Sequence, residues 1–576
     1  MPPYGDVLFI LGIALTTVTV YYFNRSIVKL PPGPRGISFF GNLFQVHALR
    51  PHPQASHTIL DCLSFLEWAQ QYGEIFHLKM GFGHMIVLNT AEAADELLAN
   101  RSKIYSSRAT PHVAQDIVSD GQRMVFMSYT REWKVLRRTL QSILGPGPSK
   151  RLRKMQELES RVVIYDLLSH ADQSVREIHL QGPNGEVPER HWFALVRRYT
   201  TSVVLHMAYG HRVHRLSNNP ELHKIYDVLG NITCVAQPGN YLADAFSSLR
   251  KLPDFLAPWR VDARKMHLWE MELWGKLFAD CRAALENGIP RAGFVASYLQ
   301  SRAEAGLQHL AGNGVTPGGS GWIRDKLLAY TAGSVLEAGS DTTATTIQIF
   351  VMLMLHNPKA LKQARQEIDE VVGMDRMPTY EDEEKLPWLV ACIKETLRRR
   401  PPTIMGVPHR VDEDDIYNGY FIPKGSTVVG NVWAIHMNPE RFPNPKAFMP
   451  ERFYEPGKPS RWGSGPDSQD RDHYAFGWGR RFCQGSHISE ASLFIVLSRL
   501  IWGVEFSAPI DPQTGKPKLP DIDDEVKTWS EGFISVPRIY PVAFKARSDK
   551  HASIIHRAFD DVQIEWQGMG LAGDER

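Results

Sequence analysis

The sequence predicts a mainly α-helical body with small β-sheets, preceded by one N-terminal transmembrane helix. Most of the chain from Ala91 to Val372 has apolar residues at helical spacing, whereas Glu74 to Asn89 alternates apolar and polar residues about a Gly81-Phe82-Gly83 centre. The first pattern is typical of helices and the second of a β-hairpin. Val7 to Asn24 is a charge-free, mostly apolar run at the lower end of the length that crosses a bilayer.

The composition is that of a folded protein with a large core. Of the 576 residues, 43% are hydrophobic and 22% are charged, which excludes disordered and collagen-like chains. The net charge of +2 gives no support for a nucleic-acid partner. The five cysteines form no C-x-x-C pair, so a reducing compartment is favoured over a zinc site or a disulfide framework.

Residues 1–24 are predicted to anchor the chain in a membrane, and residues 25–36 to form a basic, proline-rich hinge. No Lys or Arg precedes the apolar run, whereas Arg25, Lys29 and Arg35 follow it, so the positive-inside rule places the body in the cytosol. A cleaved signal peptide is the alternative, but a basic segment before the run and a small-residue cleavage site after it are missing. The prolines of the hinge prevent the helix from continuing.

Residues 322–355 contain no proline and predict one long central helix. At about 1.5 Å per residue, this segment would span on the order of 50 Å, the width of the whole body.

The chemistry concentrates in the decapeptide Phe476 to Gly485, FGWGRRFCQG, which is followed by a helical pattern from about His487. Glycine at positions 479 and 485 allows the backbone to lie close against a flat macrocycle. Cys483 precedes a helix, whose positive end and amides lower the pKa of a thiol. A buried core cysteine is the alternative, since cysteine is among the most buried residue types.

The decapeptide resembles the F-x-x-G-x-R-x-C-x-G haem-binding signature of the cytochrome P-450 family. The five marked positions are occupied by Phe476, Gly479, Arg481, Cys483 and Gly485. The resemblance implies the cytochrome P-450 fold over residues 37–544, haem b as cofactor and Cys483 as the thiolate ligand of its iron. A thiolate ligand favours O–O cleavage, so the implied activity is that of a monooxygenase. Residues 545–576 have no counterpart in the family core and are assigned as a C-terminal tail whose role the sequence does not indicate.

Three further segments resemble structural and catalytic elements of the family. Glu395 and Arg398 form an E-x-x-R pair one helical turn apart, and Arg452 lies in a P-E-R-F segment; the resemblance implies a buried structural triad of these three. Ala338 to Thr343, AGSDTT, resembles the family's oxygen-activation segment, in which Asp341 and Thr342 would relay protons. The alternative for this segment is a helix start, because S-D-T-T suits an N-cap.

The two haem propionates require buried donors, and the resemblance implies where these donors lie. The expected ligands are Trp133, Arg137, Arg410 and Arg481, with His409 as a weaker candidate.

The resemblance also implies partners. The chain shows no flavin or nicotinamide site, so electrons would come from NADPH through a separate NADPH-cytochrome reductase, with cytochrome b5 as a second candidate donor. Arg131, Lys134, Arg138 and Arg480 would face that acidic flavoprotein. The expected location is the endoplasmic reticulum membrane, with a single span and a cytosolic catalytic domain.

The predicted substrate is a lipophilic small molecule. By resemblance, the pocket would be formed by residues 106–127, the helix before Ala338, residues 403–407 and residues 532–534, which are mostly apolar. The decapeptide region is similar to that of fungal microsomal enzymes that oxidise polyketides and other secondary metabolites, such as the O-methylsterigmatocystin oxidoreductase group. Terpenoid and alkaloid pathways are further settings of the same kind.

Two rival functions use the same cysteine. A haem-thiolate isomerase or dehydratase would not activate dioxygen, and a non-enzymatic haem sensor or electron carrier would need neither Asp341 nor Thr342. Replacement of Thr342 separates these hypotheses, because only a monooxygenase depends on the proton relay.

Overall fold

The computed structural model describes residues 29–37, 40–46, 57–176, 187–214, 219–237, 240–465, 471–530 and 534–573. These residues form a mainly helical body with small β-sheets at its edge, which confirms that part of the predicted fold class. The predicted membrane helix at residues 7–24 lies outside the described residues. Within the described ranges, no helix combines the length and the apolar character needed to cross a bilayer.

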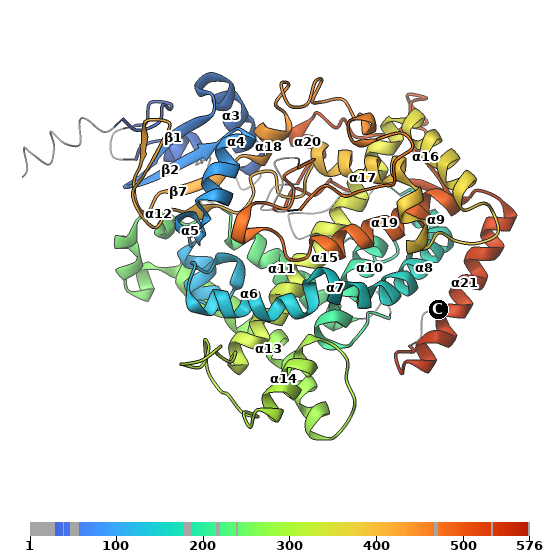
Figure 1. Ribbon diagram of the computed structural model, residues 1–576, viewed down its shortest axis with the longest axis horizontal. Helices are drawn as coiled ribbons and strands as arrows, with labels where there is room; N and C mark the ends of the chain where they lie inside the picture. Colours follow the sequence, from blue (N-terminus) through green and yellow to red (C-terminus); the bar gives the residue numbers. More distant parts are fainter. Residues whose placement is uncertain are drawn as a thin grey trace, which may run out of the picture.

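Most of the chain is helical, and the helices surround the central helix α15 (Figure 1). The described α-helices are α2 (Leu43–Val46), α3 (His57–Tyr72), α4 (Ala91–Ala94), α5 (Ser102–Tyr105), α6 (Arg131–Leu144), α7 (Pro146–Ser149), α8 (Arg153–Ser169), α9 (Ala171–Ser174), α10 (Trp192–Tyr209), α11 (Pro220–Val235), α12 (Leu242–Ala245), α13 (Pro258–Glu286), α14 (Phe294–Glu304), α15 (Asp325–His356), α16 (Pro358–Val371), α17 (Pro387–Arg399), α18 (Val432–His436), α19 (Ser486–Gly503), α20 (Glu525–Thr528) and α21 (Asp549–Gly568).

The largest described sheet has the strand order β1-β2-β7-β4-β3 and lies at one end of the body. Its strands are β1 (Ile75–Met80), β2 (Gly83–Leu88), β3 (Ser107–Arg108), β4 (His409–Arg410) and β7 (Thr427–Gly430). The predicted hairpin is confirmed, because β1 and β2 pair antiparallel from Ile75 opposite Leu88 to Met80 opposite Gly83. Two smaller pairs join β5 (Asp415–Tyr417) to β6 (Tyr420–Ile422) and β8 (Val504–Ser507) to β9 (Ala543–Ala546).

The predicted central helix is confirmed as α15, which packs against α10, α13, α17 and α19. Every residue from Thr343 to Met354 is buried, so this half of the helix belongs wholly to the core. Close packing against α13 depends on Gly333, where an added Cβ would lie 2.6 Å from the Trp274 ring. The helix that carries the predicted proton relay is therefore fixed on several sides.

The described part of the hinge, residues 29–36, packs against the strands. The backbone N–H of His77 donates to the Pro32 carbonyl at 2.8 Å, and that of Phe421 donates to the Lys29 carbonyl at 2.9 Å.

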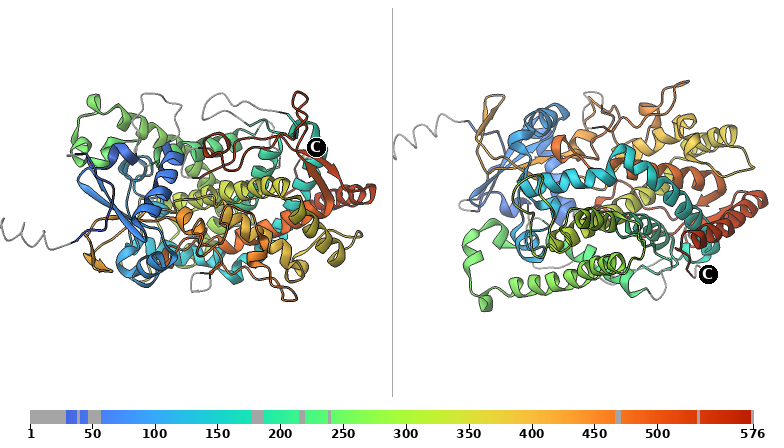
Figure 2. Two further views of the ribbon diagram at one scale, coloured as in Figure 1. Left: turned by 90° about the horizontal axis from the view of Figure 1, so that it is seen from above. Right: turned by 60° about the horizontal axis from the view of Figure 1, so that its bottom comes forward.

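The structure joins the predicted tail to the body. The expected boundary at residue 545 falls inside β9, and α21 then packs on α8 at the opposite end of the molecule from the large sheet (Figure 2). Phe559, Val562 and Trp566 of α21 are buried in one apolar cluster with residues of α8. Burial of apolar area stabilises this contact, so residues 545–573 are a structural part of the same body.

Candidate active site

A cavity of about 430 Å³ separates α15 from the decapeptide. Ala338, Gly339, Thr342 and Thr343 of α15 line one wall, and residues 474–478 and 481–485 line the facing wall. Most of the remaining lining is apolar, which suits a hydrophobic ligand. The two segments that carry the predicted chemistry therefore face each other across a single space.

Cys483 reaches this cavity from a tight loop that ends where α19 begins. The Cys483 N–H donates to the Phe476 carbonyl at 2.9 Å, and the Phe482 N–H donates to the Gly479 carbonyl at 3.1 Å. Gly479 has φ of +49°, and an added Cβ would lie 2.4 Å from the Leu98 carbonyl oxygen, so the position requires glycine. At Gly485 an added Cβ would lie 3.9 Å from the Cys483 sulfur, in ordinary contact.

Burial raises the pKa of the Cys483 thiol, while the N–H groups of Gly485 and Ser486 and the Arg137 guanidinium act in the opposite direction. The backbone N–H groups at the start of α19 lower the thiol pKa, as expected from the sequence, but burial raises this pKa by more than they lower it. A metal cation at the sulfur would remove the cost of the thiolate charge, as it does for coordinating thiols in general.

Three guanidiniums line the cavity beside the cysteine loop: that of Arg108, which is buried, and those of Arg137 and Arg481, which are partly buried. They donate to backbone carbonyls, from Arg108 to Val407, from Arg137 to Phe482 and from Arg481 to Ser106. None of them forms an ion pair with a carboxylate of the described residues, and the Arg108 Nε has no hydrogen-bond acceptor there.

Burial lowers the pKa of all three guanidiniums, to about 9 for Arg108, about 10 for Arg137 and about 8 for Arg481. Repulsion between neighbouring guanidiniums lowers the values for Arg108 and Arg481 further. Buried cations are normally paired, so this cluster fits a ligand that brings anionic groups. The two carboxylates of a haem supply such groups, and the residues present therefore fit haem.

Trp133 and Phe476 hold this region together. The Trp133 ring is buried, with the Arg481 guanidinium 4.1 Å and the Arg137 guanidinium 5.9 Å from its centroid. Phe476 lines the cavity and contacts the Phe482 ring, with the centroids 6.2 Å apart. The structure thus brings the predicted residues of the decapeptide and of α6 to one place.

The structure does not bring Arg410 to the cavity, which corrects one predicted ligand. In the antiparallel pair β3–β4, Arg108 lies opposite His409 and Ser107 opposite Arg410. Successive strand side chains point to opposite faces, so His409 and Arg108 line the cavity, whereas Arg410 is 38% exposed and contacts Asp412 at 3.3 Å. His409 is also held by a contact from its Nδ1 to the Tyr105 carbonyl at 2.7 Å.

Arg108 lies in the predicted pocket segment 106–127, but sequence reasoning did not identify it as one of the cationic groups beside Cys483. Its local sequence, Ser106-Ser107-Arg108-Ala109, gives no signal that separates it from a surface arginine. Its orientation is set by pairing with a strand about three hundred residues away in the chain.

Of the predicted relay, the structure brings Thr342 but not Asp341 to the cavity. The Thr342 hydroxyl donates to the Ala338 carbonyl at 2.7 Å, the bond to the preceding turn that bends helices. Both Asp341 oxygens accept from Arg197 of α10, at 2.6 and 3.1 Å. The helix-start alternative is wrong, because α15 continues through this segment.

Gly339 lines the cavity, but the absence of a side chain at this position is required by the contact between α15 and α10. An added Cβ would lie 2.5 Å from a methyl group of Val204, so glycine permits α10 to approach α15.

The predicted structural triad comes together in the core. Glu395 and Arg398, both fully buried on α17, form two hydrogen bonds of 2.7 Å, and the Arg452 Nε lies 3.5 Å from a Glu395 oxygen. The same Glu395 oxygen accepts from the Met449 N–H at 2.9 Å. The triad therefore fastens α17 to the segment that carries Arg452.

Only some residues of the segments that were predicted to form the substrate pocket line the cavity. Residues 123–126, 331–338, 403 and 407 contain cavity-lining side chains, and Ile534 also lines the space. Ile404 and Met405 pack into other apolar clusters instead. Residues 532 and 533 lie outside the described residues.

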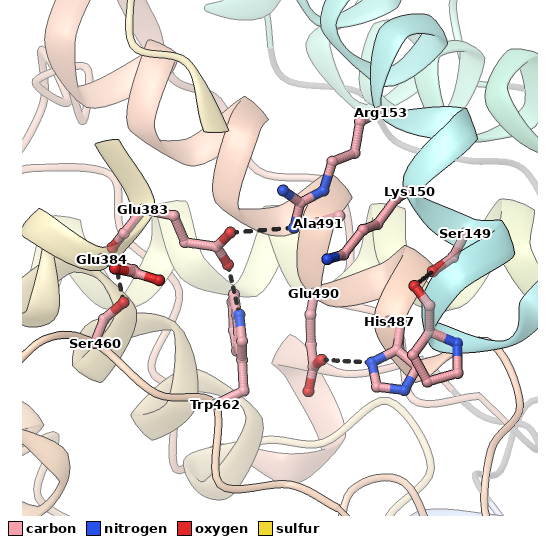
Figure 3. A pocket seen from close by; sticks show the side chains of 11 residues that line it. Ser149, Lys150, Arg153, Glu383, Glu384, Ser460, Trp462, His487, Glu490 and Ala491 are labelled. Atoms are coloured by element: carbon pink, nitrogen blue, oxygen red, sulfur yellow. Dashed lines mark hydrogen bonds and ion pairs between the residues drawn. The ribbon is translucent and has the colours of Figure 1, made fainter. Parts of the chain in front are cut away.

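A second, polar cleft lies on another face of α19 (Figure 3). Ile488, Ser489 and Ser492 of α19 face the main cavity, whereas His487, Glu490 and Ala491 face the cleft. Across it, Glu383 accepts from Trp462 at 2.7 Å and pairs with Arg153 at 3.4 Å. Its charged lining makes this cleft a poor site for a lipophilic substrate.

Burial raises the pKa of Glu490 in this cleft to about 7, although the Ser464 hydroxyl donates to it. Because the pKa of Glu490 is higher in the folded protein than in the unfolded chain, the protonated carboxyl stabilises the fold. This stabilisation is complete below pH 4.5, the pKa in the unfolded chain, and it is lost as the pH rises through about 7, the pKa in the folded protein. We therefore expect the free energy of unfolding of Glu490→Gln, measured relative to that of the parent protein, to be about 2 kcal/mol higher at pH 8 than at pH 5. Thermal unfolding at both pH values measures the difference. Glu384→Gln, at an exposed position in the same cleft, is the control, and an equal gain at pH 5 and pH 8 for Glu490→Gln would contradict the interpretation.

A thiol that faces an apolar cavity, beside guanidiniums with no carboxylate partner among the described residues, defines the haem-thiolate class of site. Comparison with known proteins agrees with this class. The family model for cytochrome P450 matches residues 31–525. Cytochrome P450 monooxygenase 69 of Postia placenta is 59% identical over 98% of both chains, and monooxygenase 79 of the same fungus is 58% identical over 99% of both. Cytochrome P450 monooxygenase fogE of Aspergillus ruber is 34% identical over 91% of this chain and 88% of its own.

The chain therefore belongs to the cytochrome P450 family. It is an enzyme of the monooxygenase class, and the family implies a haem cofactor and an external electron donor. The recognition of the family from the decapeptide is confirmed.

Proposed function

We propose that the protein inserts one oxygen atom from O₂ into a hydrophobic small molecule of fungal secondary metabolism, a polyketide, terpenoid or alkaloid. The single observation that carries the proposal is the Cys483 thiol in an apolar cavity bordered by three guanidiniums that have no carboxylate partner among the described residues. The similarity to fungal monooxygenases over nearly the whole chain supports it.

In this proposal Cys483 binds the iron of haem b, and Arg108, Arg137 and Arg481 bind the propionates, with Trp133 as their packing partner. When bound, haem supplies the iron at which dioxygen is activated, and a thiolate ligand favours O–O cleavage. The chain's own contribution is to hold the group, exclude water with apolar walls and offer the Thr342 hydroxyl as a proton donor at the facing wall.

Electrons are proposed to come from NADPH through a separate reductase, with cytochrome b5 as a second donor. Arg131, Lys134, Arg138 and Arg480 are all exposed, on α6 and in the cysteine loop. Exposed basic residues near the cysteine would attract an acidic flavoprotein and speed the encounter.

We further propose a single membrane span at residues 7–24 in the endoplasmic reticulum, with the body in the cytosol. Exposed apolar side chains at one end of the body support a membrane-facing surface. Phe82, at the tip of the β1–β2 hairpin, is 72% exposed, and its ring contacts that of Phe246 near α12. Phe255 is 82% exposed and lies in the segment between α12 and α13, as does the exposed Leu256.

The spectrum of the purified, reduced protein under carbon monoxide tests the haem-thiolate assignment. A far red-shifted Soret band is expected, because its position reports a thiolate ligand. A band typical of histidine or of a protonated thiol would contradict the monooxygenase and favour a sensor or carrier.

Thr342→Ala separates a monooxygenase from a haem-thiolate isomerase or dehydratase. Loss of the hydroxyl removes the proton donor at the cavity, and general acid catalysis of this kind contributes about a hundredfold or more. We expect NADPH consumption to continue while product falls at least about tenfold and hydrogen peroxide rises. Thr331→Val, which also removes a hydroxyl from α15 at the cavity, is the control. Unchanged coupling of NADPH to product in Thr342→Ala would count against the relay.

A further inference from the structure

A buried polar cluster interrupts the apolar wall of the main cavity, away from the cysteine loop. Its members at the cavity are Arg123 and Glu337, and both side chains are at least nine-tenths buried. The Arg123 Nε and Nη2 donate to the two Glu337 oxygens at 3.0 and 2.7 Å. Placing charged groups in a wall of this kind costs free energy, so the arrangement needs an explanation.

Behind this pair, the polar groups are occupied by the protein. Arg123 also donates to Glu270 at 2.9 Å and to the Ser119 hydroxyl, and Glu270 accepts from the Tyr330 hydroxyl at 3.2 Å. Burial raises the pKa of Glu270 to about 7, so this carboxyl is about half protonated near neutral pH. Arg123 balances the charge of Glu337, and the ionised fraction of Glu270 leaves the cluster with about half a negative charge at most near neutral pH.

The polar groups of the cluster that can still form hydrogen bonds with a ligand lie on α15. Each Glu337 oxygen accepts one bond from Arg123, which leaves a second acceptor site on each oxygen. Ser334, three residues earlier on the same helix face, lines the cavity, and its buried hydroxyl has no hydrogen-bond partner among the described residues. Buried hydroxyls are rarely left unpaired, which indicates that a ligand completes the group.

We propose that Glu337 and Ser334, with Arg123 behind them, anchor a neutral hydrogen-bond-donating group of an otherwise apolar substrate: a hydroxyl, a phenol or an amide N–H. A neutral donor is favoured over an ammonium because Arg123 already neutralises Glu337 and would repel a second cation. This inference rests on the proposed function, because it treats the main cavity as the substrate site.

The anchor also sets where the substrate is oxidised. Glu337 and Ser334 precede Thr342 by five and eight residues on α15, which at about 1.5 Å per residue is about 8 to 12 Å. A substrate held at the anchor would therefore present to the Thr342 end of the cavity a carbon about that far from its polar group.

Binding of matched probes to the purified holoenzyme, measured by calorimetry, tests the anchor. The probes are 4-phenylphenol, 4-methylbiphenyl, 4-phenylbenzaldehyde and 4-phenylbenzylamine, which share a size and differ in hydrogen bonding. We expect the phenol to bind about tenfold more tightly than the methyl analogue, because hydrogen bonds to charged groups are worth more than neutral ones.

Two variants and one control make the test specific. Glu337→Gln turns a free acceptor into an N–H donor, so the preference should move from the phenol to the aldehyde, which only accepts. Ser334→Ala should reduce the preference for the phenol about threefold. Thr331→Val is the control, because the Thr331 hydroxyl at the same cavity already donates to the Leu327 carbonyl at 2.6 Å and should leave the preference unchanged.

Three outcomes would overturn the anchor: equal affinities for phenol and methyl probes in the parent protein, the same preference in all three variants, or tightest binding of the amine. The carbon monoxide spectrum distinguishes these from failure of the proposed function. A thiolate band without probe discrimination rejects the anchor alone, whereas absence of that band in the parent protein rejects the proposed function and the anchor together.

Discussion

Replacement of Cys483 by serine is expected to abolish monooxygenase turnover to the limit of detection. A serine hydroxyl does not supply the thiolate that favours O–O cleavage, and no other described cysteine lines the main cavity. The reduced variant under carbon monoxide should therefore lack the far red-shifted band. Some haem should remain bound, because Arg108, Arg137 and Arg481 are unchanged.

The control for this substitution is Cys234→Ser, which alters an exposed cysteine outside the cavity and should leave spectrum and turnover as in the parent. A red-shifted band that persisted in Cys483→Ser would show that another residue binds the iron, and would overturn the assignment of Cys483.

Glu395→Ala is expected to produce the largest loss of stability. Glu395 is fully buried, and its removal leaves the buried Arg398 without a carboxylate partner, with only backbone carbonyls to accept from it, and the Met449 N–H without its acceptor. Breaking a buried ion pair by removing one partner costs about 3–5 kcal/mol. The apparent melting temperature of the purified protein should fall by several degrees, with less soluble protein produced.

Glu413→Ala, at an exposed glutamate, is the matched control and should change the melting temperature little. If Glu395→Ala had the same melting temperature as this control, the structural role assigned to the triad would be wrong.

Local sequence patterns predicted the parts of the site whose geometry is fixed by near neighbours. The decapeptide needs only its own turn and the start of α19 to present Cys483, and the Glu395–Arg398 pair needs only one turn of helix. The hairpin and the central helix followed from apolar periodicity for the same reason.

Features that depend on distant pairing could not be predicted in this way. Whether Arg410 or His409 faces the cavity depends on the register of β4 against β3 and β7, and a shift of one residue exchanges the two faces. The partner of Asp341 is Arg197, from another helix, and the direction of the Cys483 pKa follows from burial by the whole surrounding structure.

The sequence by itself determined the family, the central helix and the Glu395–Arg398 pair, and it singled out the cysteine that is proposed to bind iron, because short-range spacing defines each of these features. Only the tertiary structure decided that Arg108 joins Arg137 and Arg481, that α21 packs on α8, and that Arg123 and Glu337 place a polar cluster in an apolar wall. These features arise where chain segments far apart in sequence are packed together, and burial, charge pairing and strand register are properties of that packing.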